Sequence, residues 1–488
     1  MDFFNILLQS LNKIIVSFND FLWPYVLIAP LILLGAYFTF KTKFVQFRSF
    51  KEMFRLLRDG ASSQKEGSVS SFQAFCISTA SRVGTGNLAG IAIAISVGGP
   101  GAIFWMWLMA LIGAASSFVE STLAQIYKEK DSTGAFRGGP AYYMEKALGK
   151  RWMGVIFSIL ITICFGLVFN SVQSNTISIA LNEAFGINKA IIGIILTLIT
   201  ATIIFGGIHR IAKVSEVIVP IMAVAYILIS LFVMAKNITA IPEMFKAIVQ
   251  NAFGFKQIAG GTIGGTLLIG VKRGLFSNEA GMGSAPNAAA TADVSHPVKQ
   301  GLIQTLGVFT DTILICSCTA FLILLSGIDL NSGLTGIQLT QNALSSQIGS
   351  FGSIFIAVCV LLFAFSSIVG NYYYGESNIE FLSKKKIYLV MYRISVALMV
   401  LFGSISNLEI VWNLADVFMG LMAVINLIAI ALLGKFAFKA LEDYNAQKKA
   451  GIKDPIFRAS SIPELKNVTE WNDENSSFQT REDDEECA

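Results

Sequence analysis

The sequence predicts an all-α integral membrane protein with about eleven membrane-spanning helices. Of its 488 residues, 54% are hydrophobic and only 14% are charged, whereas soluble domains carry about 25% charged residues. Apolar stretches of about 20 residues, the length that a spanning helix needs, recur along the whole chain. They are longer and more continuously apolar than the alternating strands of about ten residues that build membrane barrels, so helices are favoured.

The predicted spans cover residues 21–40, 74–98, 101–126, 152–182, 189–207, 212–235, 260–290, 300–326, 350–382, 387–405 and 409–434. The chain starts without a basic segment or a small-residue cleavage site, so we expect no removable signal peptide. The six cysteines show no metal-ligand spacing, and both histidines, His209 and His296, fall in connections. We therefore expect no metal or haem centre.

Basic residues crowd some of the connections, and their distribution predicts the orientation of the chain. The first connection carries Lys41, Lys43, Arg48, Lys51, Arg55, Arg58 and Lys65. The third carries Lys128, Lys130, Arg137, Lys146, Lys150 and Arg151, and Lys384, Lys385 and Lys386 follow the ninth span. Residues 327–349 contain no Lys or Arg. The positive-inside rule places the basic connections in the cytoplasm, which predicts an outside N-terminus and a cytoplasmic C-terminus.

Two segments outside the spans have their own composition. Residues 44–66 place Phe44, Phe47, Phe50 and Phe54 opposite Arg48, Lys51 and Arg55. This pattern predicts an amphipathic helix on the cytoplasmic membrane surface. Residues 437–488 become polar and end in an acidic run, so we expect a disordered cytoplasmic tail.

Two predicted spans are interrupted by glycine and polar residues. The interruptions read Ser78-Thr-Ala-Ser-Arg-Val-Gly-Thr-Gly-Asn-Leu-Ala-Gly90 and Gly270-Val-Lys-Arg-Gly-Leu-Phe-Ser-Asn-Glu-Ala-Gly-Met-Gly283. Because a bilayer offers no water to a broken backbone, such breaks persist where they line a site. A pair of broken spans in corresponding places indicates the binding site of a secondary transporter.

The broken spans begin two segments, 67–240 and 241–436, which each hold about five spans. An odd number of spans per segment inverts the second segment relative to the first. This is the five-plus-five inverted repeat of leucine-transporter type, and residues 1–43 are then an extra N-terminal helix.

The first break offers groups that suit an amino acid and a cation. Gly84, Gly86 and Gly90 tolerate unusual backbone dihedrals. Freed N–H groups at the start of a half-helix can bind a carboxylate, and freed carbonyls can ligate sodium. The alternative is close helix packing through small residues.

The second break brings charged residues into a span, where they are costly and usually functional. We hypothesise that Arg82 and Glu279 form an ion pair that links the breaks and acts as a gate. The alternative for Lys272 and Arg273 is that they extend toward the membrane surface.

Polar residues in other spans leave further alternatives open. Gln173 fits either a polar ligand or a neighbouring helix. Glu120 fits a structural role. Asp311 fits either a proton or cation site or an ion pair. Ser366 and Ser367 can complete a sodium site with carbonyls of the first break.

Four strings give the chain a resemblance to a known family. They are Ser81-Arg-Val-Gly-Thr-Gly-Asn87, Gly138-Gly-Pro-Ala-Tyr-Tyr143, Gly274-Leu-Phe-Ser-Asn-Glu-Ala-Gly-Met-Gly-Ser-Ala-Pro286 and Tyr372-Tyr-Tyr-Gly-Glu376. With these strings the chain resembles the alanine or glycine:cation symporters, a bacterial branch of the amino acid–polyamine–organocation superfamily. The resemblance covers the membrane portion and excludes the tail.

The resemblance implies a sodium-coupled importer of a small neutral amino acid that works by alternating access in the bacterial inner membrane. It implies a sodium site made by the carbonyls of Ala80 and Val83 and the hydroxyls of Ser366 and Ser367. It implies a substrate site made by Gly84, Thr85, Gly86, Asn87, Gln173, Met282 and Asn371. The implied partners are sodium, an amino acid (alanine, glycine or glutamine) and the lipid bilayer, with no nucleic acid and no organic cofactor.

One departure from the family bears on the substrate. Many members carry tryptophan where this chain has Asn371. A carboxamide leaves more volume than an indole and adds hydrogen-bonding capacity, so a glutamine-selective transporter becomes an alternative. Proton coupling also stays open. An ion channel would need a continuous lined pore, and a membrane enzyme would need a catalytic arrangement that is absent from the spans, so both are disfavoured.

Overall fold

The computed structural model describes residues 2–62, 68–131, 134–253, 263–330, 332–406 and 408–471. Within this part, eight helices are long and apolar enough to cross a membrane: Asn12–Lys41, Gly101–Ile126, Arg151–Phe185, Ser215–Lys236, Pro297–Leu324, Phe351–Leu382, Lys386–Ile405 and Glu409–Lys449. Gly86–Gly98 and Lys189–Ile204 are shorter apolar helices. The total of about eleven spans stays a prediction. Residues 63–66 and 260–262, from two of the predicted segments, lie outside the described residues.

The N-terminal helical segment, residues 2–41, packs against the last long helix, and we call it the N-terminal rod. It consists of α1 (Asp2–Phe21), η1 (Leu22–Leu27) and α2 (Ile28–Lys41). Trp23 donates its indole N–H to the backbone carbonyl of Asp416 at 3.3 Å, in α22 (Leu408–Lys449). Two short helices, α3 (Val45–Arg48) and α4 (Phe50–Ser62), lead from this rod to the first broken helix.

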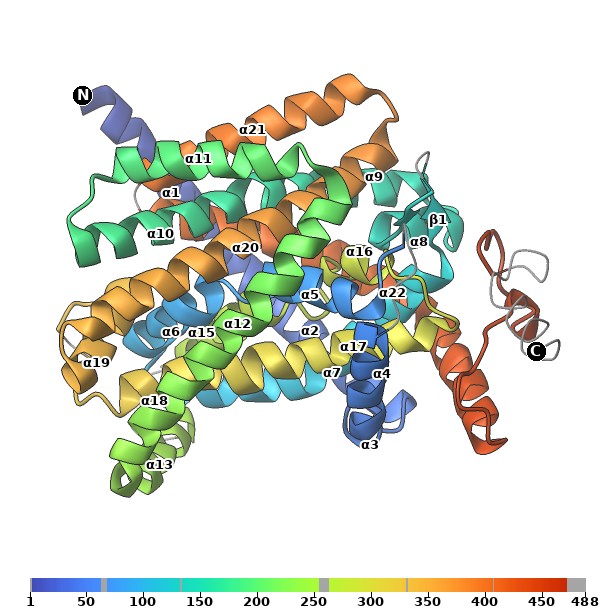
Figure 1. Ribbon diagram of the computed structural model, residues 1–488, viewed down its shortest axis with the longest axis horizontal. Coiled ribbons are helices and arrows are strands. Elements are labelled where there is room, and N and C mark those ends of the chain that lie inside the picture. Colours follow the sequence, from blue (N-terminus) through green and yellow to red (C-terminus); the bar gives the residue numbers. More distant parts are fainter. Residues whose placement is uncertain are drawn as a thin grey trace.

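The first half of the remaining chain contains one broken helix, a hairpin of two short strands and four longer helical units. Its elements are α5 (Ser71–Arg82), η2 (Gly86–Gly90), α6 (Ile91–Gly98), α7 (Gly101–Ile126), β1 (Glu129–Lys130), β2 (Phe136–Arg137), α8 (Pro140–Lys146), α9 (Arg151–Ile161), η3 (Thr162–Phe169), α10 (Asn170–Phe185), α11 (Lys189–Ile204) and α12 (Gly207–Lys236). The strands pair antiparallel. We call the end of the bundle that carries β1, β2 and residues 450–471 the hairpin end; it lies at the right of Figure 1.

The second half contains the other broken helix. Its elements are η4 (Ile238–Ala240), α13 (Ile241–Phe253), α15 (Ile263–Asn278), α16 (Ala285–Ala289), α17 (Pro297–Val308), η5 (Phe309–Cys316), α18 (Ser317–Leu324), α19 (Gly336–Ile348), α20 (Phe351–Leu382), α21 (Lys386–Ile405), α22 and η6 (Ala459–Ser461). The broken helices lie in the middle of the bundle, among α7, α17 and α20 (Figure 1).

The second break is held by a carboxylate of a neighbouring helix. Glu279, Gly281 and Gly283 have φ of 58°, 84° and 87°, a left-handed conformation that suits the two glycines. The carboxylate of Glu120 in α7 accepts hydrogen bonds from the N–H groups of Gly281 and Gly283, both at 3.1 Å. Glu120 therefore supplies the acceptors that the bilayer cannot, as its structural interpretation predicts.

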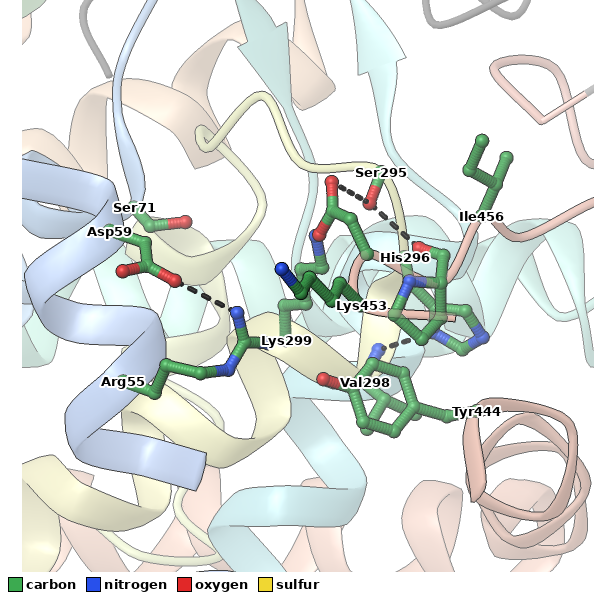
Figure 2. Close-up of polar contacts among 12 residues, drawn as sticks. Arg55, Asp59, Ser71, Ser295, His296, Val298, Lys299, Tyr444, Lys453 and Ile456 are labelled. Carbon is green, nitrogen blue, oxygen red and sulfur yellow. Dashed lines mark hydrogen bonds and ion pairs between the residues drawn. The ribbon is translucent and has the colours of Figure 1, made fainter. Parts of the chain in front are cut away.

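The C-terminal segment differs from the predicted disorder. Helix α22 continues to Lys449, and residues 450–471 lie against the hairpin end. The N–H of Phe457 donates to the carbonyl of Ser295 at 2.9 Å, and the indole N–H of Trp471 donates to the carbonyl of Gln125 at 2.8 Å. Figure 2 shows Ile456 close to Ser295, where the hydroxyl of Ser295 bonds the carbonyl of Pro455 at 2.7 Å.

The expected disorder from residue 437 is thus wrong as far as Trp471, because buried apolar side chains are spaced out within a polar composition. Phe457, Ile462 and Trp471 are each at most 6% exposed. Residues 472–488 lie outside the described part of the chain.

Trp471 also covers a buried lysine beside the hairpin. The ammonium of Lys128 lies 4.9 Å from the centre of the Trp471 ring and 3.9 Å from that of Phe136, and it donates to the carbonyl of Ala292 at 2.8 Å. Burial lowers the pKa of Lys128 to about 7, against the opposing charges of Asp293 and Glu470. Trp471 therefore contributes both apolar cover and a cation–π contact.

We expect Trp471→Ala to release the C-terminal segment, because it removes this cover and the hydrogen bond to Gln125. Trypsin should then cut after Lys466 about tenfold faster or more, since cleavage follows local opening. Limited proteolysis in detergent measures the rate. Trp152→Ala, at a tryptophan that is 61% exposed, is the matched control, and equal cleavage of the two variants would contradict the anchoring role.

Candidate functional site

The first break gathers polar groups from three elements. Helix α5 ends at Arg82, and Val83 is extended with φ −82° and ψ 90°. The N–H of Gly84 donates to the side-chain oxygen of Asn87 at 2.9 Å. The N–H of Thr85 donates to the side-chain oxygen of Gln173 in α10 at 3.0 Å. The backbone donors of Gly84 and Thr85 are therefore satisfied by side-chain amides. Gln173 faces the break through a hydrogen bond to a neighbouring element, a position that suits both of its interpretations.

The proposed sodium ligands converge on the other side of this break. The hydroxyl of Ser367 in α20 lies 2.7 Å from the carbonyl oxygen of Ala80 and 3.3 Å from that of Val83. Such a group of neutral oxygens suits a hard cation. The hydroxyl of Ser366 instead bonds the carbonyl of Phe363 in its own helix at 2.8 Å, so three of the four predicted residues come together here.

The hypothesised ion pair between Arg82 and Glu279 is wrong. Among the described ion pairs none joins these two residues. The carboxylate of Glu279 accepts from the hydroxyls of Ser81 and Ser284 at 2.8 and 2.6 Å, and Arg82 donates to the carbonyl of Gln304 at 3.2 Å. Ser81, the neighbour of Arg82, therefore donates to the carboxylate of Glu279 in place of Arg82. This hydrogen bond joins the two breaks.

Asn371 lies beside this junction with one half of its amide unused. Its oxygen accepts from the hydroxyl of Ser81 at 2.7 Å. Its amide nitrogen is buried and has no hydrogen-bond partner, and the same is true of the hydroxyl of Thr85. Met282 and Gly86, two further predicted substrate residues, are buried, and Gly86 begins η2. Unpaired buried polar groups cost about 1–3 kcal/mol each, so the amide nitrogen of Asn371 and the hydroxyl of Thr85 are candidates for contact with a ligand.

A second link between the breaks runs through Asp311, a residue that was not among the predicted substrate or sodium ligands. The side-chain nitrogen of Asn87 donates to one oxygen of Asp311 at 2.7 Å, and the hydroxyl of Ser277 donates to the other at 2.8 Å. Asp311 lies in η5, a π-helical segment, and such segments occur frequently at functional sites. The ion-pair alternative for Asp311 is absent among the described residues. An acid within an apolar span was the available signal.

A buried ion pair and an aromatic layer pack beside the first break, where Trp412 and Arg273 lie next to Gly90. Arg273 in α15 contacts both oxygens of Asp416 in α22 at 2.5 and 2.6 Å. The guanidinium carbon lies 4.8 Å from the centre of the Trp412 ring. Phe276 packs on Trp412 and on Phe169, with ring centres 4.7 and 4.5 Å apart.

This pair answers the question left open for Arg273. Its side chain is buried and paired and does not extend to a membrane surface. The sequence marks Asp416 as an acid within an apolar span, as it marks Asp311. It does not indicate that Arg273 is the partner of Asp416, so the pair could not be assembled from the sequence alone.

Sequence comparisons relate this chain to known proteins. The model of the sodium:alanine symporter family matches residues 8–459. A probable sodium/glutamine symporter, GlnT of Bacillus subtilis, is 59% identical over 463 residues, covering 95% of this chain and 96% of the relative. The sodium/alanine symporter AgcS of Methanococcus maripaludis is 37% identical and covers 91% of this chain and 99% of the relative.

A solved structure shares the fold. The crystal structure of MhsT in complex with L-phenylalanine matches 80% of this chain and 99% of its own, with a TM-score of 0.54 and 16% sequence identity. The predicted all-helical fold of leucine-transporter type is confirmed, while the five-plus-five repeat stays a prediction.

We expect Gly84→Ala to destabilise the site. A Cβ atom there would lie 2.2 Å from the hydroxyl oxygen of Ser367 and 2.8 Å from the side-chain oxygen of Gln173, and overpacking costs about 1–3 kcal/mol. The unfolding temperature in detergent should fall. Gly90→Ala is the matched control, because its nearest neighbour would be a Trp412 atom at an ordinary 3.5 Å. Equal unfolding temperatures for the two variants would contradict the close packing.

We expect Asp416→Asn to destabilise by about 3–5 kcal/mol, because it leaves the buried guanidinium of Arg273 without its anion. The double variant Arg273→Gln/Asp416→Asn should recover part of this loss, since it removes both charges. Unfolding temperatures of the single and double variants measure the coupling. Glu464→Gln, which removes an exposed ion pair with Lys439, should change little. A double variant as unstable as the sum of the single changes would refute direct pairing.

Proposed function

Because the chain belongs to the sodium:alanine symporter family, and is therefore a multi-pass membrane transporter that couples sodium to the movement of an amino acid, we propose that its substrate is glutamine. The predicted family and the predicted amino acid symport are both confirmed. The family and the relatives are symporters and not enzymes. Sodium is the coupling ion.

The observation that carries the choice of glutamine is the unused amide nitrogen of Asn371. This buried group needs an acceptor, and the side-chain carbonyl of glutamine is one. Alanine has no side-chain acceptor and would leave the group unpaired, at a cost of about 1–3 kcal/mol. The relative with 59% identity is named a probable sodium/glutamine symporter, which supports the same choice.

In this proposal the first break binds both the substrate carboxylate and sodium. The carboxylate accepts from the N–H groups of Gly84, Thr85 and Gly86, which are helped by the positive end of the half-helix dipole. It replaces the side-chain oxygens that now accept from Gly84 and Thr85. The amide of Gln173 can then turn its N–H₂ group toward the carboxylate, because one side chain holds both donor and acceptor.

Sodium is ligated in this proposal by the carbonyls of Ala80 and Val83 and by the hydroxyl of Ser367, which already lie together. Ser366 joins them by rotating its hydroxyl away from Phe363. Sodium and carboxylate then share one stretch of unwound backbone, so each favours binding of the other. This arrangement makes the gradient of the ion available to the amino acid.

We assign the hairpin end to the cytoplasm of a bacterial inner membrane and the N-terminus to the outside. The basic residues of the hairpin connection, Lys128, Lys130 and Arg137, support this orientation. In this orientation we assign the Arg273–Asp416 pair, together with Phe276 and Trp412, to the outer closure of the site. Alternating access requires this closure to open and the hairpin end to close in turn. The membrane potential contributes about 2.3 kcal/mol per inward charge per 100 mV.

Uptake into proteoliposomes with an inward sodium gradient tests the substrate. Labelled glutamine should accumulate in preference to alanine, and a potassium gradient should support neither. Asn371→Trp should depress glutamine uptake more than alanine uptake, because it removes the amide nitrogen and fills volume. A preference for alanine in the unmodified protein, or an equal loss of both substrates in the variant, would overturn the assignment of glutamine.

A further inference from the structure

A basic pocket lies where the N-terminal rod ends beside the end of α22. It has a volume of about 430 Å³ and is lined by residues 41–43, Arg48 and part of α22 between Phe438 and Lys449. Five of the lining residues are cationic and one is acidic: Lys41, Lys43, Arg48, Lys448 and Lys449, against Glu442. A pocket of this volume and charge fits a small anionic group.

Most of these cations have no anionic partner. Among the ion pairs of the described residues, only Lys448 of the five takes part, at 3.5 Å from Glu52. The ammonium of Lys41 lies 5.8 Å from the centre of the Tyr37 ring. Four of the five cations therefore form no ion pair within the described part of the chain, and the pocket keeps an excess of positive charge over its one carboxylate, that of Glu442. This excess is the electrostatic condition for holding an anion.

The chain segment that contributes Lys41, Lys43 and Arg48 to the pocket also carries a row of exposed phenylalanines. The row consists of Phe40, Phe44, Phe47, Phe50 and Phe54, which are between 44% and 68% exposed. The rings of Phe40 and Phe44 pack edge to face at 5.5 Å. In an integral membrane protein such a row belongs in the hydrocarbon layer. The basic residues alternate with it along 40–48, so anion-binding and lipid-facing side chains share one short segment.

The backbone of this segment is strained at Lys43 and Phe44, a basic residue and a phenylalanine that follow one another. Lys43 and Phe44 both have positive φ, 55° and 58°, although neither is glycine, and such residues are costly where they occur. The side chain of Gln46 anchors the turn through hydrogen bonds to the hydroxyl of Thr39 at 2.9 Å and the carbonyl of Leu111 at 3.3 Å. The turn therefore holds Lys43 and Phe44 in a fixed relation to the bundle.

We propose that this pocket is a binding site for the headgroup of an anionic phospholipid. The cations of the pocket bind the phosphate, and the acyl chains lie along the phenylalanine row. Basic pockets at the membrane surface of helical bundles bind such headgroups. A free phosphate would use the cations but not the exposed rings, so the phenylalanine row is the reason for choosing a lipid. The bound lipid would join the segment that leads into the first broken helix to the end of α22.

Binding of phosphatidylglycerol to the purified full chain in neutral detergent tests the proposal. Native mass spectrometry or a thermal-shift titration gives the dissociation constant, with phosphatidylcholine and inorganic phosphate as comparison ligands. Phosphatidylglycerol should bind more tightly than either. The variant Lys43→Gln/Arg48→Gln should weaken its binding by about 30-fold, because each cation near a membrane surface contributes to the attraction for anionic lipid.

The matched control is Lys385→Gln/Lys386→Gln, which removes the same charge from exposed lysines outside this pocket. It should leave binding of phosphatidylglycerol unchanged. Unfolding temperatures without lipid establish that both variants are folded. Equal loss in the two double variants would mean general surface attraction, equal binding of phosphatidylcholine would mean no headgroup site, and inorganic phosphate binding as tightly as phosphatidylglycerol would mean a free-anion site. Each of these results would overturn the proposal.

Discussion

The whole structure depends on one constraint: backbone groups exposed by a break in a membrane helix must find partners within the protein. Two helices break at the centre of this bundle, and side chains from other helices satisfy the freed donors. Glu120 accepts from Gly281 and Gly283, and Gln173 accepts from Thr85. The helices that carry Glu120 and Gln173 must therefore pack against the breaks. The arrangement of the bundle therefore depends on these hydrogen bonds as much as on apolar packing.

The side chains that accept from the first break differ from the one that accepts from the second in whether a ligand can replace them. The amide of Gln173, which accepts from the N–H of Thr85, has both a donor and an acceptor, so it can release this N–H to a ligand and still contact the ligand. A carboxylate such as that of Glu120 has no donor when it is ionised, which suits a permanent support. The two breaks therefore differ in kind: the first is held by replaceable partners, and the second by a fixed one.

Much of the fold was predictable from the sequence, because apolar length and glycine clusters are local signals. The breaks at Val83–Thr85 and Glu279–Gly283 fall where the glycines placed them. The resemblance to the family, rather than local pattern, implied that Ser367 lies opposite Ala80 and Val83. The partners of charged residues were harder to predict. Arg273 and Asp416 are separated by 143 residues, and local pattern carries no information about such pairs. The prediction of an ion pair between Arg82 and Glu279 was wrong for the same reason. Nothing in the local sequence indicated that Ser81 would donate to this carboxylate instead.

The hydroxyl of Ser81 has one proton and lies within hydrogen-bonding distance of two acceptors, Glu279 and Asn371. It can serve only one of them at a time, so it behaves as a toggle. When the proton goes to Glu279, the carbonyl of Asn371 loses its donor and needs another. A ligand carboxamide can supply that donor, and its arrival would then lock the proton on the second break. Because the two acceptors share one proton, binding of a carboxamide at Asn371 would strengthen the hydrogen bond from Ser81 to Glu279 that connects the two broken helices.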